Sequence, residues 1–173
     1  MDRHVVLVGL MGSGKTSIGR LVADGLGLPL IDGDEVLAER TSGKTAADIA
    51  DELGIDRLHE LEATIAVEAL QGADAAVIGP ASSVCESSAV RDAMAAHTVV
   101  WLDASPELLA AKAGRKTHRP LPDDTDLVEY FRHQLAVREP LIAALDPLVV
   151  DVEAQDDQAA ATLILEAVSR IGT

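Results

Sequence analysis

Cysteine is almost absent from this chain of 173 residues. The one cysteine, Cys85, has no second cysteine with which to form an internal disulfide, and it lacks the spacing of a metal ligand. A chain without disulfides is typical of a reducing compartment, so we expect a cytoplasmic protein. We do not expect Cys85 to act as a catalytic nucleophile.

Basic residues are also scarce. The sequence has 14 Lys and Arg against 29 Asp and Glu, which gives a formal net charge of -15. This excess of negative charge argues against general binding to nucleic acids or to anionic membranes. An anionic ligand must therefore be held by a local basic site.

The sequence has no linker and no long apolar run. No Pro-, Gly- or Ser-rich stretch marks a boundary, and with 48% hydrophobic residues the chain can form one domain with a sizeable core, residues 1–173. The apolar stretch near the N-terminus is too short to cross a bilayer, so we expect neither a secretion signal nor a membrane anchor. We expect the domain to be a monomer that acts on a small molecule.

Short apolar runs of strand length alternate with helical patterns along the chain. Strands that are joined through helices pair in parallel by default, and ligands then bind beyond the carboxyl ends of the strands. The pattern therefore predicts an α/β fold in which helices flank a five-stranded parallel sheet. The predicted strands are residues 4–8, 28–31, 75–78, 98–102 and 148–150.

The segment GLMGSGKT, residues 9–16, carries the strongest motif in the chain. It follows a predicted strand and opens a predicted helix, which is the context in which GxxxxGK[ST] indicates a phosphate-binding loop. Glycines let backbone N–H groups surround phosphate oxygens, Lys15 supplies a cation, and Thr16 offers a hydroxyl to Mg²⁺. A ligand-free glycine-rich turn is the alternative, but it needs neither side chain at these offsets. The predicted nucleotide-binding residues of the loop are Gly12, Ser13, Gly14, Lys15, Thr16 and Ser17.

Two carboxylates follow the second predicted strand, in IDGDEV. Asp32 and Asp34 should lie close to the mouth of the nucleotide site. Beside Mg²⁺-ATP, one carboxylate can orient metal-bound water and the other can accept a hydroxyl proton. The alternative for Asp34 is a helix N-cap in front of EVLAER, and both roles can coexist.

The segment KAGRKTHRPLP reverses the sign of the charge locally. Gly114 ends the preceding helical pattern and two prolines follow, which predicts a mobile lid at about residues 114–124 that closes over phosphates and excludes water. A solvated charged loop is the alternative. Arg119 is the best candidate for a contact with the transferred phosphoryl group, whereas Arg138 could equally bind a ligand or the end of its own helix. The basic residues of the segment are Lys112, Arg115, Lys116, His118 and Arg119.

Over almost its whole length the chain resembles the shikimate kinase family, most closely in GLMGSGKTSIGRLVADGLGLPLIDGDEVLAERTSGKTAADI, THRPL and VREPL. The resemblance implies a three-layer P-loop kinase fold of the nucleoside monophosphate kinase type. It also implies an enzyme, a phosphotransferase that uses ATP and Mg²⁺ to phosphorylate a hydroxyl of a small carboxylated ring. The family's catalytic roles correspond to Lys15, Asp34 and Arg119. Its other roles correspond to Asp32 on the metal through water, Lys112 beside the nucleotide, and Arg138 in a carboxylate clamp.

The sequence departs from the family pattern around the acceptor. The family's Gly-Gly-Gly aligns with Pro80, Ala81 and Ser82, which removes space and an N–H donor. The second clamp arginine aligns with His59, whose imidazole cannot replace the bidentate fork of a guanidinium. Glu62 is kept and shares a helix face with His59, so the two side chains could hydrogen-bond. The acceptor-binding residues that these alignments imply are Asp34, His59, Ala81, Ser82 and Arg138.

Three functions are compatible with this pattern. The first is a kinase that phosphorylates shikimate or a close relative, and the second is a kinase of the same fold for another hydroxylated metabolite. The third is a nucleotide-binding protein without useful kinase activity. Asp34, Arg119 and Lys15 favour an enzyme over the third function, whereas the altered loop and His59 favour the second and predict poor phosphorylation of shikimate.

Overall fold

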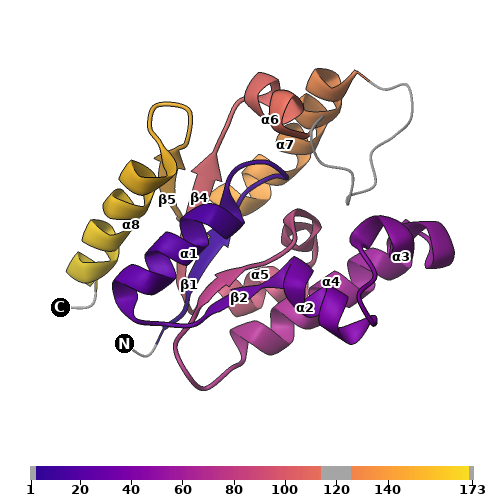
Figure 1. Cartoon of the computed structure of the whole chain (residues 1–173). Helices are drawn as coiled ribbons and strands as arrows, with labels where there is room; N and C mark the ends of the chain where they lie inside the picture. Colours follow the sequence, from indigo (N-terminus) through magenta and orange to yellow (C-terminus); the bar gives the residue numbers. More distant parts are fainter. Residues whose placement is uncertain (1–2, 114–125, 172–173) are drawn as a thin grey trace.

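Five parallel strands form the centre of the molecule in the computed structural model (Figure 1), which describes residues 3–113 and 126–171. The strands lie in the order β2-β3-β1-β4-β5, and every neighbouring pair is parallel. This confirms the predicted sheet, although β2 and β3 begin two residues later than expected. The strands are β1 (Val5–Val8), β2 (Leu30–Asp32), β3 (Val77–Gly79), β4 (Thr98–Asp103) and β5 (Leu148–Asp151).

Helices connect and cover these strands. A short 3-10 helix, η1 (Ser82–Glu86), follows β3 directly. The α-helices of the described residues are α1 (Lys15–Leu26), α2 (Gly33–Arg40), α3 (Ala46–Leu53), α4 (Ile55–Leu70), α5 (Ser88–Met94), α6 (Pro106–Ala113), α7 (Leu127–Ala143) and α8 (Asp157–Ile171).

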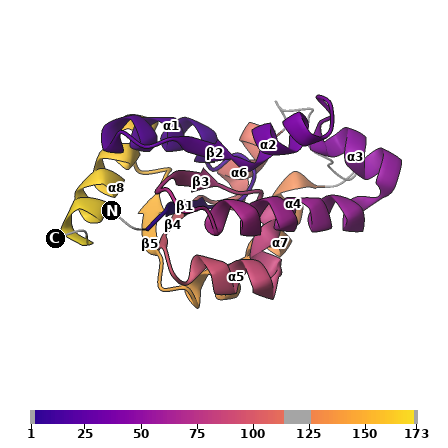
Figure 2. The same ribbon diagram turned by 90° about the horizontal axis from the view of Figure 1, so that it is seen from below.

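The sheet is the middle one of three layers (Figure 2). Successive side chains of a strand point to opposite faces, and β1 shows the result. Val5 and Leu7 pack in one core with α1 and α8, while Val6 and Val8 pack in a second core with α4 and α5. Because both faces are covered there, β1 is apolar at every position, as is typical of a strand in a parallel sheet.

A third, smaller hydrophobic cluster lies among α2, α3 and α4, beside the sheet. Its buried residues include Leu37, Ile49 and Leu58. Helix α3 begins with a capping box, in which the Thr45 hydroxyl and the Asp48 carboxylate each accept a backbone N–H of the other residue. This cluster supports a helical extension that stands beyond the carboxyl ends of β2 and β3.

Two histidines lie together at the opposite, amino-terminal edge of the sheet. The buried His4 side chain accepts the backbone N–H of Ala76 at Nδ1 (3.1 Å). The backbone N–H of His4 donates to Nδ1 of His97 (3.3 Å). Nε2 of His97 lies 3.0 Å from the carbonyl oxygen of Leu70, so it must donate there. Nδ1 of His97 then carries no proton, and burial lowers the pKa of His97.

This arrangement predicts a pH-dependent stability. The unfolded chain binds a proton at His97 more readily than the folded protein, so stability falls as the pH drops below about 6.5. Replacing His97 with Gln removes this contribution, and the free energy of unfolding should then change less between pH values of about 7.5 and 5. At the higher pH the variant should be about 1–3 kcal/mol less stable, because buried hydrogen bonds are lost.

Urea unfolding at several pH values measures the effect. His133→Gln, on the exposed surface of α7, is the matched control. Its free energy of unfolding should depend on pH as in the wild type. Identical slopes for His97→Gln and the wild type would contradict the assignment.

Candidate active site

The turn between β1 and α1 has the geometry of a phosphate-binding loop. Gly12 and Gly14 have φ values of +91° and +96°, a left-handed conformation that favours glycine. Ser13, between them, is 1% exposed, and its hydroxyl has no hydrogen-bond partner within the described residues. A buried polar group without a partner is costly, so this loop is suited to a polar ligand.

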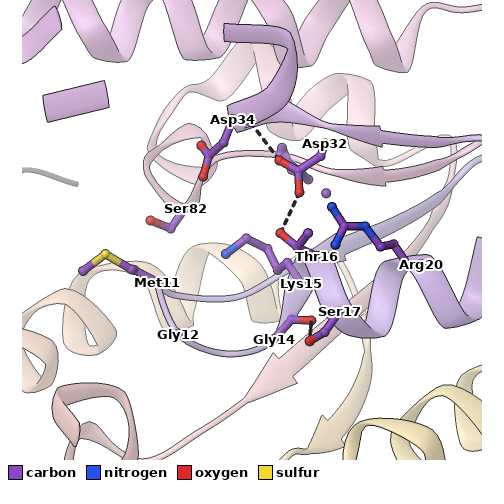
Figure 3. Close-up of a pocket in the computed structure, with 12 residues that line it drawn as sticks. Met11, Gly12, Gly14, Lys15, Thr16, Ser17, Arg20, Asp32, Asp34 and Ser82 are labelled. Carbon is purple, nitrogen blue, oxygen red and sulfur yellow. Dashed lines mark hydrogen bonds between the residues drawn. The ribbon is translucent and has the colours of Figure 1, made fainter. Parts of the chain in front are cut away.

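Lys15 is the first residue of α1 and reaches back across the loop. Its Nζ donates to the carbonyl oxygens of Gly9 (2.8 Å) and Leu10 (3.2 Å). In Figure 3 the ammonium group points into the space below Asp34 and Ser82. The cation that the motif predicted therefore lies inside the pocket, where the outer phosphates of a nucleotide would bind.

Asp32 joins the loop helix to the end of β2. Its Oδ2 accepts the hydroxyl of Thr16 (2.6 Å), and its Oδ1 accepts the backbone N–H of Asp34 (2.9 Å) (Figure 3). Asp32 thus acts as the N-cap of α2, which begins at Gly33. The alternative of an Asp34 cap was wrong, because the helix begins at Gly33, two residues earlier than the pattern suggested.

Oxygen ligands for Mg²⁺ are present beside the loop. Hydroxyl and carboxylate oxygens suit this ion, and Thr16 and Asp32 supply one of each. Residues 3–113 and 126–171 contain no cluster of three or more His, Cys, Asp or Glu side chains that could hold a metal ion alone. Mg²⁺ would therefore bind with phosphate oxygens and water as further ligands, as is usual for Mg²⁺ at nucleotides.

A cavity of about 220 Å³ surrounds these groups. Arg20, which lines the cavity, forms an ion pair with Glu35 at 2.8 Å. The cavity is lined by Met11, Gly12, Gly14, Lys15, Thr16, Ser17, Arg20, Asp32, Asp34, Gly79, Pro80 and Ser82.

A second cavity, of about 70 Å³, shares Met11 and Ser82 with the first. Side chains from α4, η1 and α7 line most of it, and they bring together His59, Ser82 and Arg138, as the resemblance implied. Asp34 belongs to the first cavity. The complete lining is Leu10, Met11, Ile55, Leu58, His59, Glu62, Ser82, Ser83, Tyr130, Phe131, Gln134 and Arg138.

One predicted acceptor residue is misplaced. Ala81 is 6% exposed and packs in the core under β3 with Ile78 and Val84, so it lines neither of these cavities. Ser83 lines the second cavity instead, and its hydroxyl donates to Glu62. Glu62, which the sequence suggested as a partner of His59, thus accepts a hydrogen bond from this serine.

Arg138 is buried on α7 and engages a residue that sequence reasoning missed. Its Nε donates to Oε1 of Glu86 at 2.8 Å, and its Nη2 lies 2.7 Å from the same oxygen. The Arg138 side chain is 9% exposed and that of Glu86 is 44% exposed. Helix α7 continues to Ala143, so Arg138 does not interact with the C-terminal end of its own helix, which was the alternative to ligand binding.

Three further predictions concern Cys85, Lys112 and Arg119. Burial raises the pKa of the Cys85 thiol to about 11, which fits its exclusion as a nucleophile. Lys112 lies on α6 beside the phosphate loop, since a Cβ on Gly12 would meet its Cβ at 3.3 Å. Arg119 and the rest of the predicted lid, residues 114–124, lie outside the described residues. No helix within the described part of the chain is long and apolar enough to cross a membrane.

Comparison with known sequences gives one consistent result. Residues 11–169 match the family model described as shikimate kinase. A shikimate kinase from Corynebacterium efficiens is 36% identical over 162 residues, which are 93% of this chain and 94% of that one. A shikimate kinase from Mycobacterium tuberculosis is also 36% identical, over 95% of this chain and 93% of that one.

Solved structures show the same fold. A shikimate kinase from Acinetobacter baumannii in complex with shikimate superimposes with a TM-score of 0.89 at 22% identity, covering 98% of this chain and 94% of that one. The shikimate kinase from Aquifex aeolicus gives a TM-score of 0.78 at 20% identity, covering 96% of both chains. A gluconokinase from Sinorhizobium meliloti resembles the chain less, with a TM-score of 0.57 at 23% identity, covering 99% of this chain and 98% of that one.

The loop geometry predicts that Lys15→Ala destroys phosphoryl transfer. Loss of the ammonium group should lower turnover by about 1,000-fold or more and weaken ATP binding, because the charge of the outer phosphates is no longer neutralised. Isothermal titration calorimetry with Mg²⁺-ATP checks the binding. Lys44→Ala is the control, because this lysine pairs with Glu52 on the exposed surface. Equal ATP affinity in Lys15→Ala and the wild type would overturn the assignment.

Proposed function

Because the chain belongs to the shikimate kinase family, we propose that it transfers the γ-phosphoryl group of ATP to a hydroxyl group of a small shikimate-like metabolite. The observation that carries the proposal is the junction of the two cavities. The phosphate-binding cavity and the cavity of α4, η1 and α7 meet at Met11 and Ser82. A phosphoryl donor in one cavity and an acceptor in the other would therefore be adjacent.

The phosphate loop would hold the nucleotide. Backbone N–H groups around Gly12 and Gly14 surround the phosphates, and Lys15 neutralises charge on the outer ones. Thr16 and, through water, Asp32 would hold Mg²⁺, which when bound neutralises charge on the phosphate oxygens. The fit of these oxygen donors to Mg²⁺ supports this assignment.

Asp34 would accept the proton of the attacking hydroxyl. It projects from the first turn of α2 into the cavity that holds Lys15, on the side of Ser82 (Figure 3). Its backbone is fixed, because its N–H donates to the Asp32 carboxylate. A carboxylate held between donor and acceptor is suited to act as the general base of an alcohol kinase.

Further roles follow from the resemblance and stay predictions. Arg119 would contact the transferred phosphoryl group, and Lys112, beside the loop, would contact the nucleotide. The acceptor would lie against His59, Ser82 and Arg138. The net charge of -15 supports a small-molecule acceptor without nucleic acid or membrane partners, and the single cysteine supports a cytoplasmic location. The monomeric state stays a prediction.

A second candidate function is phosphorylation of a different hydroxylated metabolite. The observation that favours it is the side chain of His59 in the acceptor cavity, where the family pattern has a clamp arginine. An imidazole cannot form the two parallel hydrogen bonds that a guanidinium forms with a carboxylate. The loss of one such partner favours an acceptor other than shikimate.

Asp34→Asn should separate chemistry from nucleotide binding. The amide keeps the size of the side chain and the backbone N–H, but it cannot accept a proton. We expect turnover to fall by about 100- to 10,000-fold, the usual worth of a general base. The affinity for Mg²⁺-ATP should change by no more than about threefold, because the nucleotide contacts remain.

Stopped-flow or coupled ADP assays and calorimetry measure the two quantities. Asp24→Asn, on the exposed surface of α1, is the control and should behave as the wild type. Full activity of Asp34→Asn would show that Asp34 is not the general base.

Acceptor-dependent ADP release tests the proposed function directly. The purified protein is incubated with Mg²⁺-ATP and a panel of hydroxy acids, polyols and nucleosides that includes shikimate. At least one hydroxylated metabolite should accelerate ADP release, with the phosphorylated product seen by mass spectrometry. We expect kcat/KM for shikimate to be low, by about one to two orders of magnitude, because the second clamp arginine is missing.

If no acceptor accelerates ADP release although Mg²⁺-ATP binds, the protein is a nucleotide-binding homologue without kinase activity. If shikimate is turned over with the efficiency of an ordinary metabolic enzyme, the argument from His59 is wrong.

A further inference from the structure

Few charged side chains line the described part of the acceptor cavity. Among the described residues that line it, Arg138 is the single Lys or Arg, and Glu62 is the single Asp or Glu. The cation is not available to a ligand without rearrangement, because it is paired with Glu86. Together with Glu86, the described residues around this space contribute two carboxylates and one guanidinium.

Glu86 binds the Nε/Nη2 edge of the Arg138 guanidinium, an edge at which carboxylates commonly bind. Nε and Nη2 lie 2.8 Å and 2.7 Å from the same oxygen of Glu86, so adjacent N–H groups share one acceptor. Arg138 is 9% exposed, and its contact is therefore little screened by water. A ligand carboxylate that bound this edge would have to displace Glu86.

The rest of the cavity offers little compensation to an anion. The Ser83 hydroxyl already donates to Glu62. His59 and Gln134 can provide single hydrogen bonds, but neither forms the fork of an arginine. A carboxylate that entered here would compete with Glu86 for Arg138 and would lie near Glu62, whose like charge repels it.

We propose that Glu86 is a specificity-determining residue of the acceptor site. By holding the Arg138 guanidinium, it makes the site select a polyol without a carboxylate over a carboxylated acceptor of the same shape. The inference rests on the proposed phosphoryl transfer and specifies its acceptor class. A purely structural ion pair would instead affect stability and leave the preference between acceptors unchanged.

A pair of acceptors that differ only in charge tests this proposal. Shikimate and its carboxamide present the same ring and hydroxyls, with and without the negative charge. For the wild type, kcat/KM with the carboxamide should equal or exceed kcat/KM with shikimate. In Glu86→Gln, kcat/KM for shikimate should rise by about tenfold or more, while that for the carboxamide should stay within about threefold.

Three further measurements make the result specific. Glu166→Gln, an exposed change on α8, is the matched control and should leave both values unchanged. The double variant Glu86→Gln with Arg138→Gln should lose the gain for shikimate, because the gain requires the released guanidinium. Thermal unfolding of Glu86→Gln checks that its fold is intact, which the 44% exposure of the Glu86 side chain leads us to expect.

The outcomes separate the inference from the function on which it rests. A wild type that prefers shikimate over the carboxamide by about tenfold, or a Glu86→Gln variant with an unchanged preference, overturns the inference and leaves the kinase intact. If neither compound accelerates ADP release in the wild type or in Glu86→Gln, the shikimate-like acceptor of the proposed function is wrong. The inference about its charge then fails with it.

Discussion

One carboxylate fixes the geometry of the phosphoryl-transfer half of the molecule. Asp32 accepts the Thr16 hydroxyl with one oxygen and the backbone N–H of Asp34 with the other. Helix α1, which follows the phosphate loop, and helix α2, which carries the candidate base, are thereby tied to the end of the edge strand β2. Because the parallel strands all end at this edge, the two helices begin beside each other.

The acceptor half is built on a different principle. In the turn after β3, side chains that face the core and side chains that face the cavities lie within a few residues of each other. Ala81 and Cys85 are buried against the sheet, whereas Ser82 lines both cavities and Ser83 is held by Glu62. Recognition here thus depends on pairs of side chains that come from different elements, not on a backbone motif.

This difference explains what the sequence could predict. The strands, the phosphate loop and Asp32 follow from local patterns, because apolar runs and a motif of fixed spacing lie within a few residues of each other. Ala81 was assigned by alignment with the family's glycines, and the alignment could not show that the turn into the 3-10 helix buries this side chain in the core. Glu86 carries no local signal at all, since its partner Arg138 lies 52 residues away in the chain.

The hydrophobic cluster of α2, α3 and α4 is a third packing unit beside the sheet. Leu37, Ile49 and Leu58 belong to it, and they are not members of the two cores that flank the sheet. His59 follows Leu58 on α4 and belongs to neither of the two sheet cores, so an exchange at this position leaves the packing of the sheet in place. In evolutionary terms, such a lineage can change its acceptor by mutation while the machinery that handles the nucleotide stays folded.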